Sequence, residues 1–312
     1  MTTMKSMRIH DYGDASVLKY EDVARPAPQA GEVLIRVAAI GVNPVDWKLR
    51  SGVGKRFGLP LPIALGADVA GTVEAVGEGV TAFKAGDEVF AMVGLWGAYA
   101  EYVAVSAEVV AAKPKSMDFV QAASVPLAAL TAWQGLFDKG NLQAGQTALI
   151  YGAAGGVGMF GVQLAKAKGA NVVATASEKN AAFVRELGAD DVVDYRTDSA
   201  ERYPTDVDLA LDMIGGDAAG HCIDALKTGG AHVQISPGGT EHLAEKAAAK
   251  NVEMVAVQVR PNGQQLREIA ELIDAGKVKT EVAATFSLAE TGKAHDLSAQ
   301  GHTRGKIVLT CG

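Results

Sequence analysis

Cysteine is nearly absent from this chain, with only Cys222 and Cys311 among its 312 residues. Two cysteines so far apart in the sequence provide neither a disulfide framework nor a cysteine cluster for a structural metal. The six histidines are scattered and lack the short spacings of metal ligands, so we expect surface or packing roles for them. Cysteine and histidine usage therefore predicts no metal centre.

Long apolar runs are also missing. No stretch reaches the roughly 18 apolar residues that a membrane-spanning helix requires. Residues 1–8 contain no apolar core of a secretory signal, which favours a soluble, cytoplasmic protein. The formal net charge of −7 argues against nucleic acid or an anionic membrane as a partner.

Glycine, by contrast, is plentiful, with 36 residues scattered among apolar segments. This pattern is typical of a folded protein with many tight turns. The N-terminal part shows short strand patterns between Pro and Gly turns without regular helices, which predicts a β-barrel-like unit. The expected strands are 7–9, 32–40, 68–76, 88–92 and 101–105.

From Phe119 onward, strand and helix patterns alternate. Such alternation predicts a parallel sheet with helices on both faces. After an expected helix at 123–136, the predicted strands are 147–151, 171–175, 191–193, 208–212 and 231–235, followed by an apolar segment at 251–259. The expected tail, which we predict to fold back on the first unit, consists of helix 264–275, strand 282–286, helix 288–298 and strand 306–309.

Residues 152–158, Gly-Ala-Ala-Gly-Gly-Val-Gly, are the most informative stretch. They follow a predicted strand and precede a helical pattern, which is the context of a dinucleotide-binding turn with A-x-G-x-x-G spacing from Ala153. Gly155 lets the backbone approach a pyrophosphate, and Gly158 lets the helix pack against the strand. The helix N-terminus, with Gly156 and Val157, then faces the phosphate charge. A merely tight turn is the alternative interpretation.

The residues after the next strand indicate which dinucleotide binds. A site for NAD carries Asp or Glu about 20 residues past the glycines. Here Ser177 occupies that position and is followed by Glu178 and Lys179. A hydroxyl beside a lysine suits the 2′-phosphate, so we predict NADP(H) bound by Ser177 and Lys179. An inward-pointing Glu178 would favour NAD, and capping of the next helix is a further interpretation of Ser177 and Lys179.

Further motifs occur in a fixed order along nearly the whole chain. They include Gly41-Val-Asn-Pro-Val-Asp46, Gly66-Ala-Asp-Val-Ala-Gly71, Ala98-Tyr-Ala-Glu-Tyr102, Pro126-Leu-Ala-Ala-Leu-Thr-Ala-Trp133 and Gly305-Lys-Ile-Val308. With the glycine turn, they resemble the zinc-independent quinone oxidoreductase (zeta-crystallin-like) group of the medium-chain dehydrogenase/reductase superfamily. The resemblance implies an α/β protein with a GroES-like β-barrel domain (1–122 and 262–312) and a Rossmann doubly wound parallel-sheet domain (123–261).

The chain departs from the zinc-dependent branch of that superfamily. Asn43 stands where zinc alcohol dehydrogenases carry a Cys, and Ala67-Asp68 stands where they carry His-Glu. A catalytic zinc needs about three protein ligands, which these residues do not supply. Without a Lewis acid, alcohol oxidation is disfavoured. The resemblance therefore implies hydride transfer from NADPH to a small quinone or α,β-unsaturated carbonyl, acceptors that take hydride readily.

By resemblance, Asn43 and Thr131 lie beside the nicotinamide and the acceptor. An amide or hydroxyl there donates a hydrogen bond to the oxyanion that develops during hydride transfer. The alternative for Asn43 is a turn-forming role before Pro44. We expect Asp46 to organise its loop rather than to titrate in catalysis. The proton donor and the physiological acceptor stay open.

Four more residues are expected to contact the cofactor by resemblance. Tyr195, Ile214 and Ser236 follow predicted strands, at the edge where an open α/β sheet binds ligands. Lys306, in the closing Gly-Lys pair, is expected to meet a phosphate. Ordinary turn and packing roles are the alternative for each.

Two other functions stay open at this point. One is an enoyl-thioester reductase, which the acidic charge balance disfavours, and the other is a non-enzymatic, NADPH-binding crystallin-like protein. The resemblance also implies a homodimer. The candidate for its contact is the β-branched segment 252–259, late in the Rossmann sheet, which can pair edge to edge with its copy.

Overall fold

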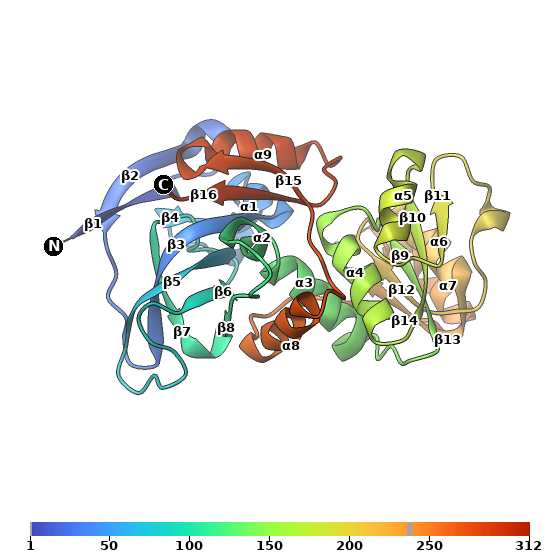
Figure 1. Ribbon diagram of the computed structural model, residues 1–312. Coiled ribbons are helices and arrows are strands. Elements are labelled where there is room, and N and C mark those ends of the chain that lie inside the picture. Colours follow the sequence, from blue (N-terminus) through green and yellow to red (C-terminus); the bar gives the residue numbers. More distant parts are fainter. Residues whose placement is uncertain (1, 236–238) are drawn as a thin grey trace. The chain divides into compact units, whose positions relative to one another are not determined.

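The computed structural model describes residues 2–235 and 239–312 (Figure 1). The chain forms two compact units. The first unit comprises Met1–Leu127, Arg260–Asp274 and Thr280–Gly312, and the second comprises Ala128–Val259 and Ala275–Lys279. The sequence analysis expected domain boundaries at residues 122 and 262, and the chain passes between the two units at Leu127–Ala128 and Val259–Arg260. The expected boundaries remain a proposal.

The first unit is built around one long strand. In β3 (Glu32–Val42), Val33, Ile35 and Val37 lie on one pleat face and are buried, whereas Arg36 on the other face is exposed. Residues 39–42, at the end of the strand, are all buried. Its sheet has the order β15-β16-β3-β5-β6-β8, and β7 also pairs with β3. The partners are β5 (Asp68–Val76), β6 (Glu88–Met92), β7 (Tyr102–Ser106), β8 (Val110–Ala112), β15 (Val282–Ser287) and β16 (Lys306–Thr310).

A smaller sheet of order β2-β1-β4 completes the β structure described for this unit. Its strands are β1 (Thr3–Ile9), β2 (Leu18–Ala24) and β4 (Ile63–Ala64). The sequence analysis missed β2, because its residues Leu-Lys-Tyr-Glu-Asp-Val-Ala carry few apolar side chains and lie on a largely exposed edge. These two sheets confirm the strand-rich first unit that the sequence predicted.

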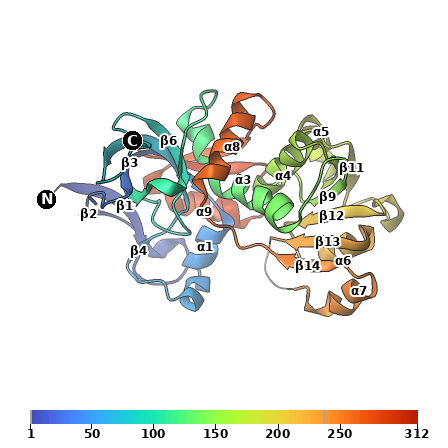
Figure 2. The ribbon, with the colours of Figure 1, turned by 90° about the horizontal axis from the view of Figure 1, so that it is seen from below.

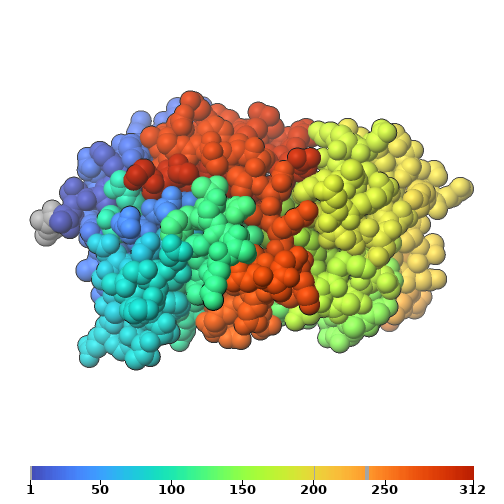
Figure 3. Space-filling model, viewed as in Figure 1, coloured from blue at the N-terminus to red at the C-terminus, as the bar shows by residue number. Residues whose placement is uncertain are grey.

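The C-terminal tail rejoins this first unit, as the sequence predicted. β16 pairs antiparallel with β3, with Ile307 opposite Val42, and β15 continues the sheet. α9 (Thr291–Ala299) packs on these strands and on the helix α1 (Pro44–Arg50). In the space-filling view the red C-terminal residues lie against the blue N-terminal ones (Figure 3). α8 (Gly263–Asp274) contacts β8 of the same unit.

The second unit contains a six-stranded, fully parallel sheet of order β11-β10-β9-β12-β13-β14. Counted along the chain this is the 3-2-1-4-5-6 order of a doubly wound Rossmann fold, which confirms the predicted class. The strands are β9 (Thr147–Tyr151), β10 (Asn171–Ala176), β11 (Asp191–Asp194), β12 (Val207–Asp212), β13 (Leu226–Gln234) and β14 (Glu253–Ala256).

Helices cover both faces of this sheet (Figure 2). α4 (Gly156–Ala167) lies on the face that carries Ile150 and Leu211, because Gly161 of this helix approaches both side chains. α6 (Asp217–Ala225) lies on the opposite face, in one core cluster with Leu149 and Ala210. The unit also contains the helices α5 (Glu178–Glu186) and α7 (Ala244–Ala249).

The single helix expected at 123–136 was wrong. The structure has α2 (Phe119–Ala123), α3 (Pro126–Trp133) and a π-helical segment at Gln134–Lys139. Pro126 explains the break, because a proline has no N–H to donate and disfavours a helical residue before it. Within the described residues, we find no helix with the length and apolar character needed to cross a membrane.

Candidate functional site

The glycine turn lies at the C-terminal end of β9, as the sequence predicted. Gly152 has a φ of +89°, a left-handed conformation that favours glycine. The turn is tied to the neighbouring strand β10, because Gly152 N–H donates to Thr175 Oγ1 and Ala153 N–H donates to the Thr175 carbonyl, both at 3.0 Å. The chain therefore enters α4 at a fixed position, with Gly155 as its N-cap residue.

Gly158 and Gly155 differ in whether the surrounding protein leaves room for a side chain. A Cβ at Gly158 would collide with the Gly152 carbonyl oxygen and lie 2.7 Å from Ala153 Cα, so only glycine lets α4 pack on the turn. A Cβ at Gly155 would find its nearest neighbour, the Gly152 oxygen, at 3.4 Å, an ordinary contact. The protein itself therefore tolerates a side chain at 155, and the close approach of a ligand stays the proposed reason for glycine there.

The first turn of α4 presents backbone N–H groups without intrahelical partners, at Gly156, Val157 and Gly158. Such donors and the helix dipole together favour a phosphate group. Gly156 and Val157 are only partly buried. The contact of Ala153, Gly155, Gly156, Val157 and Gly158 with the cofactor remains a proposal, and the geometry of the turn suits it.

Ser177 and Tyr195 lie at the ends of the neighbouring strands β10 and β11, where Ala176 pairs with Asp194. Glu178 N–H donates to Asp194 Oδ2 at 2.9 Å, which holds the two strand ends together. Ser177 is buried and is the N-cap residue of α5, yet among the described residues its hydroxyl makes no capping bond. Within residues 2–235 and 239–312, the one hydrogen bond found for its Oγ is a long one, accepted from Asn180 at 3.4 Å. Capping therefore does not account for the Ser177 hydroxyl.

Lys179 and Glu178 are exposed, and Tyr195 is 46% exposed. Sequence reasoning missed Arg196, whose guanidinium lies 5.6 Å from the centre of the Tyr195 ring. A cation two residues past the end of β11 was a readable signal, because Tyr195 beside it was already expected to contact the cofactor. Lys179 and Arg196 together make this edge of the sheet suitable for a phosphate.

Ile214 follows β12 and is 58% exposed, in a turn held by Asp212. The Asp212 carboxylate Oδ1 accepts the N–H groups of Ile214 and Gly215 at 2.8 and 2.9 Å. Ser236, the expected contact after β13, lies outside the described residues. The cofactor roles of Ile214 and Ser236 therefore remain proposals.

The structure also brings His232 beside Asp212 and Cys222, which the sequence spacing had not suggested. All three are fully buried, and Asp212 Oδ2 lies 3.1 Å from His232 Nε2. Hydrogen bonds from His232 and from the two turn amides lower the pKa of Asp212, although burial alone would raise it. These partners satisfy the carboxylate, so the cluster is explained as an internal polar contact that fastens the Ile214 turn.

In the first unit, Asn43 directly follows β3 as the N-cap residue of α1 and is 1% exposed. Its side-chain Nδ2 donates to Asp68 Oδ2 at 2.9 Å, and its Oδ1 accepts from the ammonium of Lys306. Lys306, 4% exposed, also donates to the Val42 carbonyl at 3.1 Å and lies 3.8 Å from Asp68 Oδ2. The structure thus joins the two predicted site residues Asn43 and Lys306 and adds Asp68, which sequence reasoning considered only as a zinc position.

Burial shapes the ionisation of this group. Desolvation raises the pKa of Asp68 to about 6, opposed by Lys306, Asn43 and the Leu127 N–H that donates to it at 2.8 Å. Desolvation lowers the pKa of Lys306, opposed by Asp68 and Asp46. All three acceptors around the ammonium, the Val42 carbonyl, the Asn43 amide oxygen and the Asp68 carboxylate, belong to its own unit. The expected phosphate contact of Lys306 remains a proposal.

Asp46 organises the loop before α1, as we expected, because its Oδ2 accepts the Asn43 N–H at 2.8 Å. The same oxygen accepts from the Tyr99 hydroxyl at 2.8 Å. Tyr99 lies 2.9 Å from His295 Nε2, and Arg50 lies 3.3 Å from His295 Nδ1. Since a guanidinium only donates, Nδ1 accepts, and the proton sits on Nε2.

This chain of hydrogen bonds therefore runs in one direction, from Arg50 through His295 and Tyr99 to Asp46. Burial and the Arg50 charge lower the pKa of His295 to about 3, so the imidazole is neutral at pH 7. Desolvation raises the pKa of Asp46 to about 7, against the bonds from Asn43 and Tyr99. Sequence analysis missed Tyr99 and His295, because no local pattern links residues 196 positions apart.

The residues at the zinc positions of the superfamily do not fit a zinc ion. Asn43 offers an amide that is already bonded on both sides, and Ala67 offers no ligand atom. Asp68 is the remaining carboxylate, and the Lys306 ammonium lies against it. A buried cation in this place opposes a second one by charge repulsion. We therefore derive no chemistry through zinc.

Thr131, the second residue expected beside the acceptor, lies on α3 and is 3% exposed. It belongs to the second unit, whereas Asn43 belongs to the first. Its role as a hydrogen-bond donor remains a proposal.

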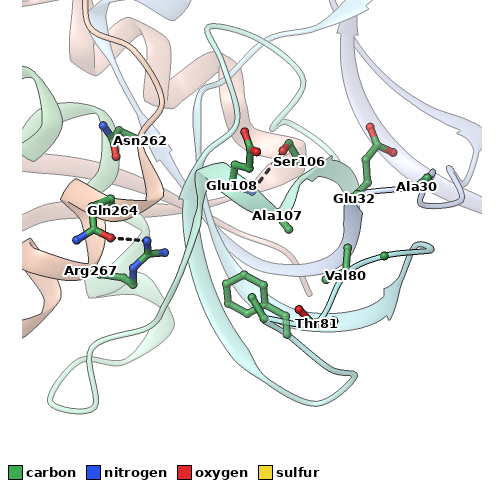
Figure 4. Close-up of a pocket in the computed structure, with 14 residues that line it drawn as sticks. Ala30, Glu32, Val80, Thr81, Ser106, Ala107, Glu108, Asn262, Gln264 and Arg267 are labelled. Carbon is green, nitrogen blue, oxygen red and sulfur yellow. Dashed lines mark hydrogen bonds between the residues drawn. The ribbon is translucent and has the colours of Figure 1, made fainter.

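An open hollow of about 690 Å³ lies on the first unit, between residues 79–83, residues 106–108 and the start of α8 (Figure 4). Glu32, Glu108 and Arg267 line it, and Arg267 donates to Gln264 Oε1 at 2.6 Å. No residue that the sequence analysis assigned to cofactor or substrate lines this hollow. It therefore takes no part in the proposed chemistry.

Comparison with known proteins gives two family matches. Residues 29–115 match the family described as alcohol dehydrogenase GroES-like domain, and residues 187–309 match the family described as zinc-binding dehydrogenase. The first match lies within the β-rich first unit. The second match covers the later part of the Rossmann unit and most of the C-terminal tail.

Individual relatives cover nearly the whole chain. The chain is 35% identical, over 99% of its length and 92% of the relative, to the protein named NAD(P)H oxidoreductase RTN4IP1, mitochondrial, of Danio rerio. It is 37% identical, over 98% of its length and 79% of the relative, to NADPH-dependent alkenal/one oxidoreductase, chloroplastic, of Arabidopsis thaliana. The solved quinone oxidoreductase of Coxiella burnetii is 34% identical with a TM-score of 0.92, covering 100% of both chains. The chain belongs to the medium-chain dehydrogenase/reductase superfamily, among its quinone and alkenal oxidoreductases.

Proposed function

We propose that this protein is an NADPH-dependent reductase that transfers hydride to quinones or to alkenes conjugated with a carbonyl, without a metal. The observation that carries the proposal is the buried amide of Asn43, held between Asp68 and Lys306 at the zinc positions of the superfamily. Relatives named quinone oxidoreductase and alkenal/one oxidoreductase act on the same acceptor classes. An acceptor that is already electrophilic needs orientation and a hydrogen-bond donor rather than a Lewis acid.

NADP(H) fits the second unit. The α4 N-terminus and the close-approach position at Gly155 suit the pyrophosphate. Ser177, Lys179 and Arg196 gather hydroxyl and cationic groups at neighbouring strand ends, where the 2′-phosphate of NADPH is expected. Glu178, the carboxylate that would favour NAD, is exposed at this edge, so the relative affinities for NADPH and NADH decide between the two cofactors.

The bound cofactor supplies a hydride, two electrons with one hydrogen nucleus. Negative charge then develops on the acceptor oxygen, and one proton taken up from solvent or a protein group completes the reduced product. We assign Asn43 and Thr131 as the donors to that oxygen, because an amide N–H and a hydroxyl O–H both stabilise an oxyanion. These donors contribute most in the transition state, where the charge is larger than in the bound acceptor.

The direct test is consumption of NADPH by the purified protein with a panel of quinones, alkenals, cyclic enones and enoyl thioesters. We expect turnover with quinones or enones, retention of activity in chelator, and no stoichiometric zinc by elemental analysis. Turnover only with enoyl thioesters would favour an enoyl-thioester reductase instead. One tightly bound zinc per chain, with activity lost in chelator, would overturn the metal-free mechanism.

We also propose a homodimer. β14 is the edge strand of the Rossmann sheet, at the end of the order β11-β10-β9-β12-β13-β14, and lies within the segment 252–259. An edge strand with unpaired backbone groups can pair with the same strand of a second copy. Light scattering at micromolar concentration is expected to give twice the chain mass, and a monomer would contradict the proposal.

The location of the protein is a separate proposal, and we propose the cytoplasm. Relatives are named as mitochondrial or chloroplastic, so the location needs its own test. Fractionation of the source cells with an antibody to this chain is expected to place it with cytoplasmic markers. Recovery in a membrane-bounded compartment would contradict the proposal.

A further inference from the structure

A buried ammonium stands beside the proposed catalytic amide. Lys306 begins β16, and the pairing of β16 with β3 sets Ile307 opposite Val42. This register brings the Lys306 side chain to the end of β3, where Asn43 follows. Burying a lysine is costly unless its charge is paired and hydrogen-bonded. Such a residue at this place calls for a reason beyond packing.

The surroundings of Asn43 permit one orientation of its amide. Oδ1 faces the Lys306 ammonium, and Nδ2 faces the Asp68 carboxylate at 2.9 Å. Rotating the amide by half a turn would set N–H groups against the ammonium and the oxygen against the carboxylate. Both contacts would then be repulsive. Lys306 and Asp68 thus decide which way the amide points.

The backbone of Asn43 is fixed independently, by the bond from its N–H to Asp46 Oδ2 at 2.8 Å. One of the two Nδ2 hydrogens is donated to Asp68. The other points to the Gly41 carbonyl oxygen, which lies 3.5 Å from Nδ2, a marginal distance for a hydrogen bond. An ammonium on the amide oxygen draws electron density from the nitrogen and makes its N–H a stronger donor. The weakly held hydrogen is the one that an acceptor oxygen would recruit.

We propose that Lys306 is a positioning residue for hydride transfer, which acts through Asn43 by fixing and polarising its amide as a donor. The inference rests on the proposed function of Asn43. In this proposal, the Lys306 ammonium provides positive charge at the zinc positions of the superfamily. The ammonium contacts Asn43, and Asn43 rather than Lys306 contacts the acceptor. Asp68 completes the arrangement by holding the opposite end of the amide.

A double-mutant cycle tests this coupling. Lys306→Met removes the charge at similar length, and it is compared in the wild type and in the Asn43→Ala background. We expect kcat with a quinone to fall on the order of tenfold in the wild-type background. NADPH affinity is expected to stay nearly unchanged, because the ammonium is bonded to Asn43 and to the Val42 carbonyl. Weaker NADPH binding with an unchanged kcat would support the phosphate contact expected from the sequence and would overturn the positioning role. In the Asn43→Ala background we expect little further loss. An equal loss in both backgrounds, or an unchanged kcat in Lys306→Met, would overturn the proposal.

Lys293→Met is the matched control, because Lys293 is an exposed lysine of the first unit that pairs with Glu290 at 2.8 Å. Its kcat is expected to equal that of the wild type. Lys306→Met leaves Asp68 buried without its cation, which destabilises the fold. If that variant does not fold, the cycle is run with Asp68→Asn/Lys306→Met, which leaves no unpaired charge at this place.

A second readout does not depend on activity. The side-chain amide resonances of Asn43 are identified in an NMR spectrum by their loss in Asn43→Ala. We expect them to shift in Lys306→Met and to stay in place in Lys293→Met. Unchanged resonances in Lys306→Met would refute the positioning role, even in an active enzyme. A wild type that reduces no acceptor would instead refute the proposed function, whatever the resonances show.

Discussion

Gly158 packs directly on Gly152, so closely that a Cβ at position 158 would collide with the Gly152 carbonyl oxygen. The same Cβ would lie 2.7 Å from Ala153 Cα. Both neighbours are backbone atoms, which cannot move away as a flexible side chain does. We expect Gly158→Ala to lower the free energy of unfolding by about 1–3 kcal/mol, the usual cost of overpacking. Urea denaturation measures this cost.

Gly155→Ala is the matched variant, because its Cβ would meet protein atoms only at an ordinary 3.4 Å. We expect it to keep the stability of the wild type and to weaken NADPH binding by about tenfold, or about 1.4 kcal/mol. The methyl group would occupy the place of close approach to the pyrophosphate. Unweakened NADPH binding in Gly155→Ala would show that the cofactor does not approach this residue.

Ser177→Asp is expected to reverse or abolish a preference for NADPH over NADH. A carboxylate at 177 repels the 2′-phosphate and accepts a hydrogen bond from the 2′-hydroxyl of NADH. The Ser177 hydroxyl makes no capping bond among the described residues, so the loss of a cap does not confound the comparison. Dissociation constants of both cofactors are measured by titration. Equal affinities in the wild type would indicate that Ser177 does not govern the choice.

Asn43→Ala is expected to lower kcat more than it weakens NADPH binding. Loss of a donor to the developing oxyanion typically costs about 3 kcal/mol, and we expect about 1–2 kcal/mol because Thr131 or water shares the task. The melting temperature is also expected to fall, because Asp68 and Lys306 lose the amide between them. Steady-state kinetics with a quinone and an enone decide the matter. Unchanged kcat with both acceptors would remove Asn43 from the mechanism.

The lowered pKa of His295 is expected to cause part of the pH dependence of the free energy of unfolding. Its pKa is about 3 in the folded protein, against about 6.5 for a free histidine. Below pH 6.5 the unfolded chain therefore binds a proton that the folded protein does not, and stability is lost as pH falls from about 6.5 to about 3. The slope is at most about 1.4 kcal/mol per pH unit.

Asp46 acts in the opposite sense over an overlapping range. Its raised pKa of about 7 means that the folded protein keeps a proton that the unfolded chain loses above about pH 4, so stability falls as pH rises from about 4 to about 7. We expect His295→Gln to remove only the histidine contribution. Unfolding free energies measured from pH 7.5 to 4.5 should then lose less on acidification than in the wild type.

His10→Gln is the control for this experiment, because His10 is exposed and pairs with Glu21 at the surface. It measures the effect of replacing a surface histidine by glutamine, with which the change in His295→Gln is compared. A profile for His295→Gln that is parallel to that of the wild type would contradict a neutral, buried imidazole.

The sequence by itself determined the Rossmann unit and the position of its glycine turn. These features rest on interactions between near neighbours: apolar runs that form strands, a glycine with positive φ, and a helix that must pack on the turn. Such patterns are readable without knowledge of distant contacts. The same logic located Ser177 and Tyr195, because parallel strands end at a common edge of the sheet.

Only the tertiary structure decided what surrounds Asn43. Lys306 reaches it across 263 positions of sequence, through the pairing of β16 with β3, and its charge meets an amide and a carboxylate that no local pattern joins to it. His295 meets Tyr99 in the same way, through the packing of α9. The physical reason is that burial removes water as a partner, so each polar group must find another. Which group it finds depends on the register of distant strands, and that register is a property of the whole fold.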